Sequence, residues 1–201
     1  MLMPARYERF VLANFDTKGK LILYRIENPL LLVIDFQVRL MQSIHNHEVL
    51  ERKAAALIKG CHILGMPILT TQQYTKGLGD TIPALKEALC ESPYIEKITF
   101  SCCGNSEFID KLNASKKNNI LVTGVEAHIC VQQTVLDLLA MGNQVYVIAD
   151  CIGSRSESDY TYGIERMRQS GAVITTMESV LFEFLQRADH PKRKEISNLV
   201  K

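Results

Sequence analysis

The chain has 201 residues, of which 47% are hydrophobic and 22% are charged. This balance is typical of one globular domain and argues against a disordered chain. Its 23 Lys and Arg residues oppose 22 Asp and Glu residues, which gives a formal net charge of +1 and argues against a protein that binds nucleic acid or an anionic membrane surface. No apolar run approaches the roughly 18 residues of a membrane span, so we expect no membrane partner.

Strands and helices are expected to alternate along the chain. Continuous apolar runs predict strands at residues 30–36, 66–71, 119–124, 144–149 and 172–175, with a further extended segment at 94–101. Amphipathic spacing predicts helices at residues 48–64, 82–90, 106–116, 127–140, 156–169 and 178–186, and a last one from about 191. The alternation is typical of an α/β protein with a three-layer α/β/α, Rossmann-like fold around a central, mostly parallel sheet of about six strands.

We expect one domain over residues 1–201, in which residues 1–28 form an N-terminal extension. The apolar stretch KLILYRI near the end of this extension favours an added edge strand or a contact between subunits. In a parallel sheet, functional sites lie beyond the carboxyl ends of the strands. The places to look for a site are therefore Asp35, the loop 71–79, and residues 124–130 and 150–153.

Six cysteines could form three disulfides or remain as six free thiols. Their density is low for a secreted domain stapled by disulfides, and none belongs to a Cys-x-x-Cys pair of the kind that binds zinc or exchanges disulfides. The N-terminal sequence also lacks the apolar core of a signal peptide. We therefore expect free thiols and a cytoplasmic protein, with import into an organelle as the alternative.

One cysteine, Cys130, lies where a predicted strand passes into a predicted helix. The segment VTGVEAHICVQQT places the end of the strand at Gly124 and the cysteine in or near the first helical turn. Free backbone N–H groups and the positive end of the helix dipole favour ionisation there, and the thiolate is the nucleophilic form. The alternative is a buried cysteine that packs as a small hydrophobic residue.

Two charged residues interrupt apolar segments. Asp35 ends the most apolar strand, where a carboxylate needs a partner, and the alternative is a residue that caps a helix or anchors a loop. Lys97 lies in an otherwise apolar extended segment, and the alternative is a solvent-exposed residue on an edge strand. Together with Cys130, these residues could bring an acid, an amine and a thiol to one edge of the sheet.

Three motifs resemble the isochorismatase-like cysteine hydrolases, a family that includes nicotinamidases, carbamoylsarcosine amidohydrolase and ureidoacrylate hydrolases. LLVIDFQ resembles the strand that bears the catalytic Asp, EKITFSC the segment that bears the Lys, and TGVEAHICV the cysteine motif. The resemblance covers roughly residues 29–185. It is closer to the branch of isochorismatase domain-containing proteins, which TTQQYTKGLG, RMRQSGA and HPKRKEISNLVK also resemble.

The resemblance implies a metal-independent hydrolase that cleaves a small amide or related carbonyl compound through a thioester on Cys130. Asp35 would take the thiol proton, and Lys97 would pair with Asp35 and favour the thiolate. The backbone N–H groups of Glu126 and Cys130 would bind the oxyanion, next to a cis peptide bond between Val125 and Glu126. A homo-oligomer, a dimer or larger, is also implied. The alternative is a non-catalytic interaction or scaffold protein on the same fold.

The chain departs from the metal-dependent nicotinamidases. Their Asp-x-His motif after the second strand is replaced by TTQQY at residues 70–74, which contains no His and no carboxylate. We therefore predict no catalytic metal and no cofactor. His45 and His47 form a His-Asn-His sequence that could suggest a pair of metal ligands, although exposed loop residues are the simpler interpretation.

Residues beside the three motifs are candidates for the substrate pocket, with packing or loop hydrogen bonding as the alternative. They are Gln37, Gln73, Tyr74, Phe100 and His128. We expect His128 at the pocket rim or in a structural role, because Asp35 already fills the role of the base. The other five cysteines are expected to be structural.

Overall fold

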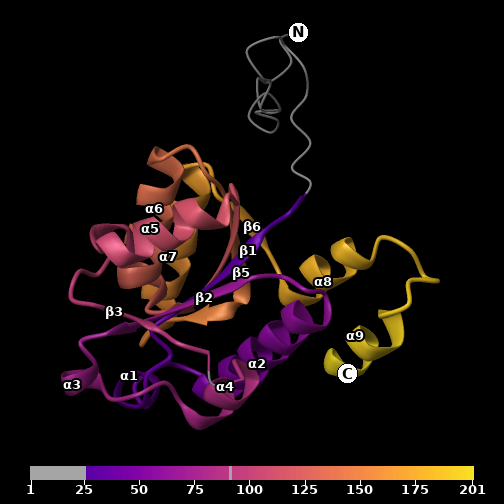
Figure 1. Ribbon diagram of the computed structural model, residues 1–201. Coiled ribbons are helices and arrows are strands. Elements are labelled where there is room, and N and C mark those ends of the chain that lie inside the picture. The colour runs from indigo at the N-terminus through magenta and orange to yellow at the C-terminus, as the bar shows by residue number, and fades with distance from the viewer. Residues whose placement is uncertain (1–25, 91) are drawn as a thin grey trace, which may run out of the picture.

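The computed structural model describes residues 26–90 and 92–201. Within them the chain forms a six-stranded sheet in the order β3-β2-β1-β4-β5-β6, and all neighbouring strands are parallel (Figure 1). The strands are β1 (Leu30–Ile34), β2 (Ile68–Gln73), β3 (Ile95–Lys97), β4 (Asn119–Val125), β5 (Gln144–Gly153) and β6 (Val173–Thr175). The predicted fold class is thereby confirmed.

Helices cover both faces of the sheet (Figure 1). One face is packed by α2 (His47–Ile63), α4 (Pro83–Ala88), α8 (Met177–Leu185) and α9 (Arg193–Leu199). The other is packed by α5 (Ser106–Ser115), α6 (Gln132–Ala140) and α7 (Glu157–Gln169). Short elements fill the connections: α1 (Val38–Met41), α3 (Thr75–Leu78), the 3-10 turn η1 (Cys102–Gly104) and the π-helical turn η2 (Ala127–Val131).

The central strand β1 shows why two cores form. Side chains alternate between the faces of a strand, so Leu31 and Val33 join the core under α2, whereas Leu30, Leu32 and Ile34 join the core under α5, α6 and α7. All five side chains are buried. A strand buried on both faces needs apolar residues at every position, which explains the continuous apolar run in the sequence.

The strand order places a topological switch beside β1. The chain passes from β1 to β2 and β3 on one side, and later to β4, β5 and β6 on the other. Connections diverge at such a switch and leave room for a site at the carboxyl ends of the strands. Asp35 and Gly124 lie there, after β1 and near the end of β4 respectively.

Strand β5 is longer than the sequence suggests. Its predicted end is Ala149, but the strand continues to Gly153. The polar residue Asp150 is tolerated inside the strand because its carboxylate bonds Nζ of Lys53 at 2.8 Å and the backbone N–H of Met177 at 2.8 Å. The added residues pair with the last residues of β4 after a shift of register.

The predicted helix at 127–140 has a different beginning from the one expected. It starts as η2 and becomes the α-helix α6 at Gln132. Apart from Ile26, the KLILYRI segment lies outside the described residues, as does nearly all of the N-terminal extension. In the part of the chain that the structure describes, no helix combines the length and the apolar character needed to cross a membrane.

Candidate active site

Asp35 directly follows β1, and its backbone lies in the left-handed region with φ = 55°. Asp is one of the few residues that visit this conformation readily. Its backbone N–H donates to the carbonyl of Thr71 in β2 at 3.2 Å, so the turn remains tied to the sheet. The side chain is fully buried at the switch, and a buried carboxylate is costly unless other groups bond it.

Lys97, at the end of β3, is the ionic partner of Asp35. Its Nζ lies 2.6 Å from Oδ2 of Asp35, and neither side chain is exposed. The ammonium also donates to Oε1 of Gln73 at 2.7 Å and to the carbonyls of Phe100 at 3.1 Å and Thr99 at 3.3 Å. These bonds fold the chain back over the ammonium, so β3 ends at Lys97 and is shorter than the predicted extended segment. The interpretation of Lys97 as a solvent-exposed residue is wrong.

The other carboxylate oxygen of Asp35 is also bonded. Thr71 donates from Oγ1 to Oδ1 at 2.8 Å, and the thiol of Cys130 is close enough for the thiol and the carboxylate to shift each other's pKa. Burial raises the pKa of Asp35, while the Lys97 charge and these hydrogen bonds oppose the rise. Asp35 is therefore a carboxylate of increased basicity held in a fixed orientation.

Cys130 lies in η2 and is 6% exposed. Burial, followed by the negative charge of Asp35, raises the pKa of its thiol to about 12, although Lys97 opposes the rise. The expectation of an easily ionised thiol is therefore wrong for the resting site, because desolvation outweighs the advantage of a helix start. A nucleophilic Cys130 must lose its proton to a neighbouring base during the reaction.

Ionisation alone does not distinguish Cys130 from Cys61, Cys102 and Cys103. All six cysteines are free, as expected. Burial raises the pKa of Cys61 and Cys103 to about 12 and that of Cys102 to about 11. Cys130 differs because Asp35 acts on its thiol both through its charge and as a potential hydrogen-bond acceptor, whereas Asp35 acts on Cys102 through its charge alone. The distinction therefore comes from its neighbours.

The turn that carries Cys130 is held from several directions. The peptide bond between Val125 and Glu126 is cis, at the position that the resemblance implied. The carbonyl of Glu126 accepts hydrogen bonds from the N–H groups of Ile129 at 3.0 Å and Val131 at 3.2 Å. These two bonds close the turn around Cys130.

Side chains anchor the same turn to its surroundings. The carboxylate of Glu126 lies 2.9 Å from Nε of Arg155. Thr134 donates from Oγ1 to the carbonyl of Cys130 at 2.7 Å and accepts from the backbone N–H of Cys102 at 3.0 Å. The cysteine turn, the Lys97 loop and the end of β5 are thus linked by hydrogen bonds.

The candidate pocket residues divide into two groups. Gln37 and Gln73 are buried, and Gln37 donates from Nε2 to the Gln73 carbonyl at 3.0 Å and accepts from its N–H at 2.7 Å at Oε1. Gln73 in turn bonds Lys97, so this pair braces Lys97 instead of facing a substrate. Tyr74 and Phe100 are 48% and 55% exposed. Tyr74 follows Gln73 in sequence, and the carbonyl of Phe100 accepts from Lys97, so both positions are consistent with the rim of a substrate pocket.

His128 is held on the side of β5. Its Nδ1 lies 2.9 Å from Oγ of Ser154, and its Nε2 lies 3.9 Å from a carboxylate oxygen of Asp159. These contacts match a structural role better than the role of a base.

Sequence reasoning missed Thr71 and Thr134. Thr71 carried a usable signal, because the polar pair Thr70–Thr71 ends an apolar strand predicted to lie in the same sheet as Asp35. Thr134 carried none, since a threonine at that helical position has no distinguishing neighbour in sequence.

The two histidines of the His-Asn-His sequence have separate roles. His45 pairs with Glu157 at 3.2 Å, and His47 begins α2. Over residues 26–90 and 92–201, no three or more His, Cys, Asp or Glu residues come together in a way that could hold a metal ion.

The fold and the site together define the class: a doubly wound α/β protein in which a buried carboxylate, ammonium and thiol meet at the switch point of a parallel sheet. The chain belongs to the isochorismatase family, since residues 29–179 match the family model described as Isochorismatase domain. The resemblance drawn from the three motifs is thereby confirmed.

Relatives and solved structures agree with this assignment. The chain is 36% identical over 175 residues to isochorismatase domain-containing protein 2 of Danio rerio, and the match covers 87% of each chain. It resembles the structure of MAR1 ribonuclease from Caenorhabditis elegans with a TM-score of 0.82 and 38% identity, over 88% of this chain and 91% of that one. It shares the fold of the Escherichia coli YcaC gene product, described as an octameric hydrolase of unknown specificity, with a TM-score of 0.80 and 23% identity over 89% and 88% of the two chains.

Proposed function

We propose that this isochorismatase-family protein is a metal-independent cysteine hydrolase that cleaves a small amide or related carbonyl compound through a thioester on Cys130. The observation that carries the proposal is that Asp35 is ion-paired with Lys97 and is close enough to the Cys130 thiol for the two groups to shift each other's pKa. A buried ion pair contributes little net stability compared with apolar packing. A chemical role explains better why a buried ion pair lies beside a thiol.

Asp35 acts first as a general base. It accepts the Cys130 proton while the sulfur attacks the carbonyl carbon, so that a C–S bond forms and the carbonyl electron pair moves onto oxygen. When the carbonyl re-forms, the C–N bond breaks, and Asp35 returns the proton to the leaving amine. Water then attacks the thioester and transfers a proton to Asp35. The intermediate then expels the Cys130 thiolate, which releases the acid. The thiolate regains the proton from Asp35, and this restores Cys130.

Two further groups support this sequence. Lys97 holds Oδ2 of Asp35 at 2.6 Å, which fixes the orientation of the carboxylate. The backbone N–H groups of Glu126 and Cys130 are the proposed donors to the oxyanion, where preorganised donors lower the barrier by several kcal/mol, on the order of 3. The bonds from Ile129 and Val131 to the Glu126 carbonyl keep this backbone in place.

A metabolite panel tests the activity. Amides, ureas and carbamoyl compounds are incubated with the protein, and ammonia or amine release is measured beside Cys130→Ala. We expect Cys130→Ala to lose turnover by about a thousandfold or more. Cys90→Ala, which removes an exposed cysteine, is the matched control. Turnover that survives in a folded Cys130→Ala protein contradicts the proposal.

The covalent intermediate provides an independent readout. Rapid acid quenching during turnover, followed by mass spectrometry, is expected to find the acyl group of the substrate on the peptide that contains Cys130. In Asp35→Asn the acyl form is expected to be absent, because the thiol has no base to accept its proton.

A non-catalytic scaffold is the second candidate. It predicts that a cellular phenotype caused by loss of the protein is restored equally by the wild-type chain and by Cys130→Ala. Restoration by the wild type alone favours the hydrolase.

A ribonuclease is a third candidate, and the name of the Caenorhabditis elegans relative is what favours it. The near-neutral charge of the chain argues against tight RNA binding. RNA cleavage by the purified wild type that disappears in Cys130→Ala would support the ribonuclease and count against a small-molecule hydrolase.

We also propose a homo-oligomer in a reducing, cytoplasmic setting. The octameric description of the YcaC fold neighbour and the exposed apolar side chains of Tyr74, Ile98 and Phe100 support assembly. The six free cysteines support the location. Light scattering coupled to size-exclusion chromatography tests the assembly, and imaging of a tagged full-length chain tests the location.

A further inference from the structure

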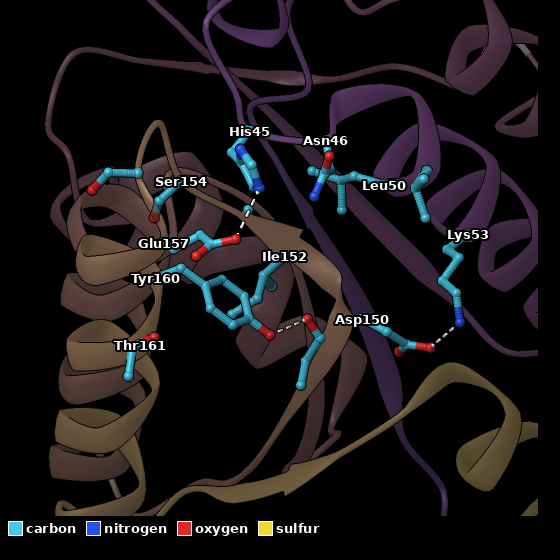
Figure 2. A pocket seen from close by; sticks show the side chains of 14 residues that line it. His45, Asn46, Leu50, Lys53, Asp150, Ile152, Ser154, Glu157, Tyr160 and Thr161 are labelled. Carbon is cyan, nitrogen blue, oxygen red and sulfur yellow. Dashed lines mark hydrogen bonds and ion pairs between the residues drawn. The ribbon is translucent and has the colours of Figure 1, made fainter.

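A cavity of about 450 Å³ lies apart from Asp35, Lys97 and Cys130, none of which lines it. It is bounded by the beginning of α2, the end of β5 and the beginning of α7 (Figure 2). Its volume falls in the range of small-molecule sites. Its position at the carboxyl end of β5 is also where ligands bind in doubly wound sheets.

One part of the cavity wall is apolar. Val49 and Leu50 of α2, Ile152 of β5 and the ring of Tyr160 of α7 contribute to it. The hydroxyl of Tyr160 donates to the carbonyl of Ala149 at 2.8 Å (Figure 2), which fixes the ring. The wall therefore suits a flat apolar body.

Charged pairs lie at opposite ends of the cavity in Figure 2. At one end, Lys53 bonds Oδ2 of Asp150 at 2.8 Å, and the other oxygen of Asp150 accepts the Met177 N–H at 2.8 Å. Both groups are thus engaged by protein. At the other end, Glu157 pairs with His45 at 3.2 Å, and the Glu157 side chain is 82% exposed. An incoming cation can replace or join His45 there.

The charged side chains of the lining favour one sign of ligand charge. With His45 counted as neutral, two carboxylates, Asp150 and Glu157, face the single ammonium of Lys53. A carboxylate or phosphate ligand would meet like charge at Glu157, whereas an ammonium would meet a partner.

We propose that this cavity binds a small amphipathic cation, an aromatic or branched apolar body bearing an amine, with the ammonium on Glu157 and the body against Val49, Leu50 and Tyr160. The site is separate from the substrate site at Cys130, and the proposal does not depend on the proposed hydrolase activity.

The cavity adjoins the backbone that carries Cys130. Ile152 and Gly153 line it and pair with Gly124 and Val125 of β4. Ser154 also lines it and contacts His128 of η2 at 2.9 Å. A ligand in the cavity therefore rests against the strand pairing that holds the cysteine turn.

The natural absence of tryptophan permits a site-specific fluorescence test. Thr161→Trp places a single indole at the cavity, because Thr161 lines it. Tyr162→Trp places one at the neighbouring exposed position, which does not line it. The full-length chains are titrated with benzylamine, benzyl alcohol and benzoate. Benzylamine is expected to give a saturable change in tryptophan fluorescence in Thr161→Trp only. Benzyl alcohol is expected to bind more weakly, and benzoate most weakly.

The introduced indole could fill the cavity and block binding. Saturation-transfer NMR on chains without tryptophan therefore measures the same binding independently. Glu157→Gln is expected to weaken benzylamine binding about threefold to fivefold, as for an exposed ion pair, and to leave benzyl alcohol unchanged. Glu165→Gln, on an exposed position of the same helix, is the matched control and is expected to change neither. The proposal is overturned by no saturable benzylamine binding to the wild type at millimolar concentration, by a preference for benzoate, or by equal benzylamine binding in Glu157→Gln and the wild type.

Discussion

Lys97 reaches Asp35 across an intervening strand. Asp35 follows β1 and Lys97 ends β3, with β2 between them, yet their charged atoms are 2.6 Å apart. Gln73 of β2 is in register with Lys97 and accepts from the same ammonium at 2.7 Å. The end of β2 therefore serves as the support on which the pair is built.

Lys97→Met tests the energetic role of this pair. The substitution keeps an unbranched side chain but leaves the Asp35 carboxylate buried without its cation, which costs about 3–5 kcal/mol. We expect a drop of that size in the free energy of unfolding, measured by urea denaturation, together with loss of turnover.

The pair of Lys53 and Asp150 is the control for Lys97→Met. The Lys53 side chain is 42% exposed, so Lys53→Met is expected to cost less than about 1 kcal/mol. Asp35→Asn combined with Lys97→Met is expected to recover part of the lost stability and no activity. Equal effects of Lys53→Met and Lys97→Met would contradict the importance of burial.

The raised pKa of Cys130, about 12, predicts how the thiol reacts. Because the thiol is the protonated form below this pKa, the thiolate fraction should grow about tenfold for each pH unit, without a plateau near neutrality. Alkylation of Cys130 by iodoacetamide, followed by peptide mass spectrometry between pH 7 and 10, is expected to show this continuous rise. Alkylation of the exposed Cys90 in the same samples is the control for the reactivity of the reagent.

Asp35→Asn separates reactivity from catalysis. The negative charge of Asp35 is the second largest cause of the raised Cys130 pKa, so its removal should lower that pKa and speed alkylation at pH 8. The same variant should lose turnover, because the base is gone. Unchanged alkylation in Asp35→Asn would mean that Asp35 does not act on the thiol.

The sequence predicted the layers of the fold because these depend on local patterns. Apolar runs such as 30–34 identify strands that are buried on both faces, whatever their neighbours. Asp35 was recognisable for the same reason, as a carboxylate at the end of such a run. The strand order, by contrast, depends on packing between distant segments, and the support of Lys97 by Gln73 follows from that order.

The protonation state of the site was the least predictable feature. A cysteine in a helical turn suggests a low pKa, but burial raises the pKa of the Cys130 thiol, and the extent of that burial depends on tertiary packing. The extension of β5 to Gly153 was missed for a similar reason. Asp150 looks like a strand end until its bonds to Lys53 and the Met177 N–H are known.

Thr71→Val tests how Asp35 is held. The Thr71 hydroxyl bonds Oδ1 at 2.8 Å and lowers the pKa of Asp35 against the effect of burial. Because folding raises the Asp35 pKa, the stability linked to this group is present at low pH and is lost as the pH rises through the folded pKa. Losing the hydroxyl should raise that pKa further.

The cost of Thr71→Val should therefore depend on pH. It is expected to be about 1.5–3 kcal/mol where Asp35 is ionised and smaller near pH 4. Urea denaturation at both pH values measures the difference, and Thr71→Ser, which keeps the hydroxyl, should recover most of the stability and the turnover. A cost that does not change with pH would show that Thr71 acts only through packing.

Gly124→Ala tests whether the site requires the close approach of β1 and β4. Gly124 has φ = 146°, and a Cβ there would lie 2.4 Å from the carbonyl oxygen of Ile34, the residue before Asp35. The conformational penalty of about 1–2 kcal/mol is then increased by overpacking of about 1–3 kcal/mol. Gly142→Ala is the control, since Gly142 also has a positive φ of 83° but no atom within 4 Å of its Cβ position. The midpoint temperature of thermal unfolding should be much lower for Gly124→Ala than for Gly142→Ala. Only Gly124→Ala should lose turnover, because displacement of Ile34 moves Asp35 away from Cys130.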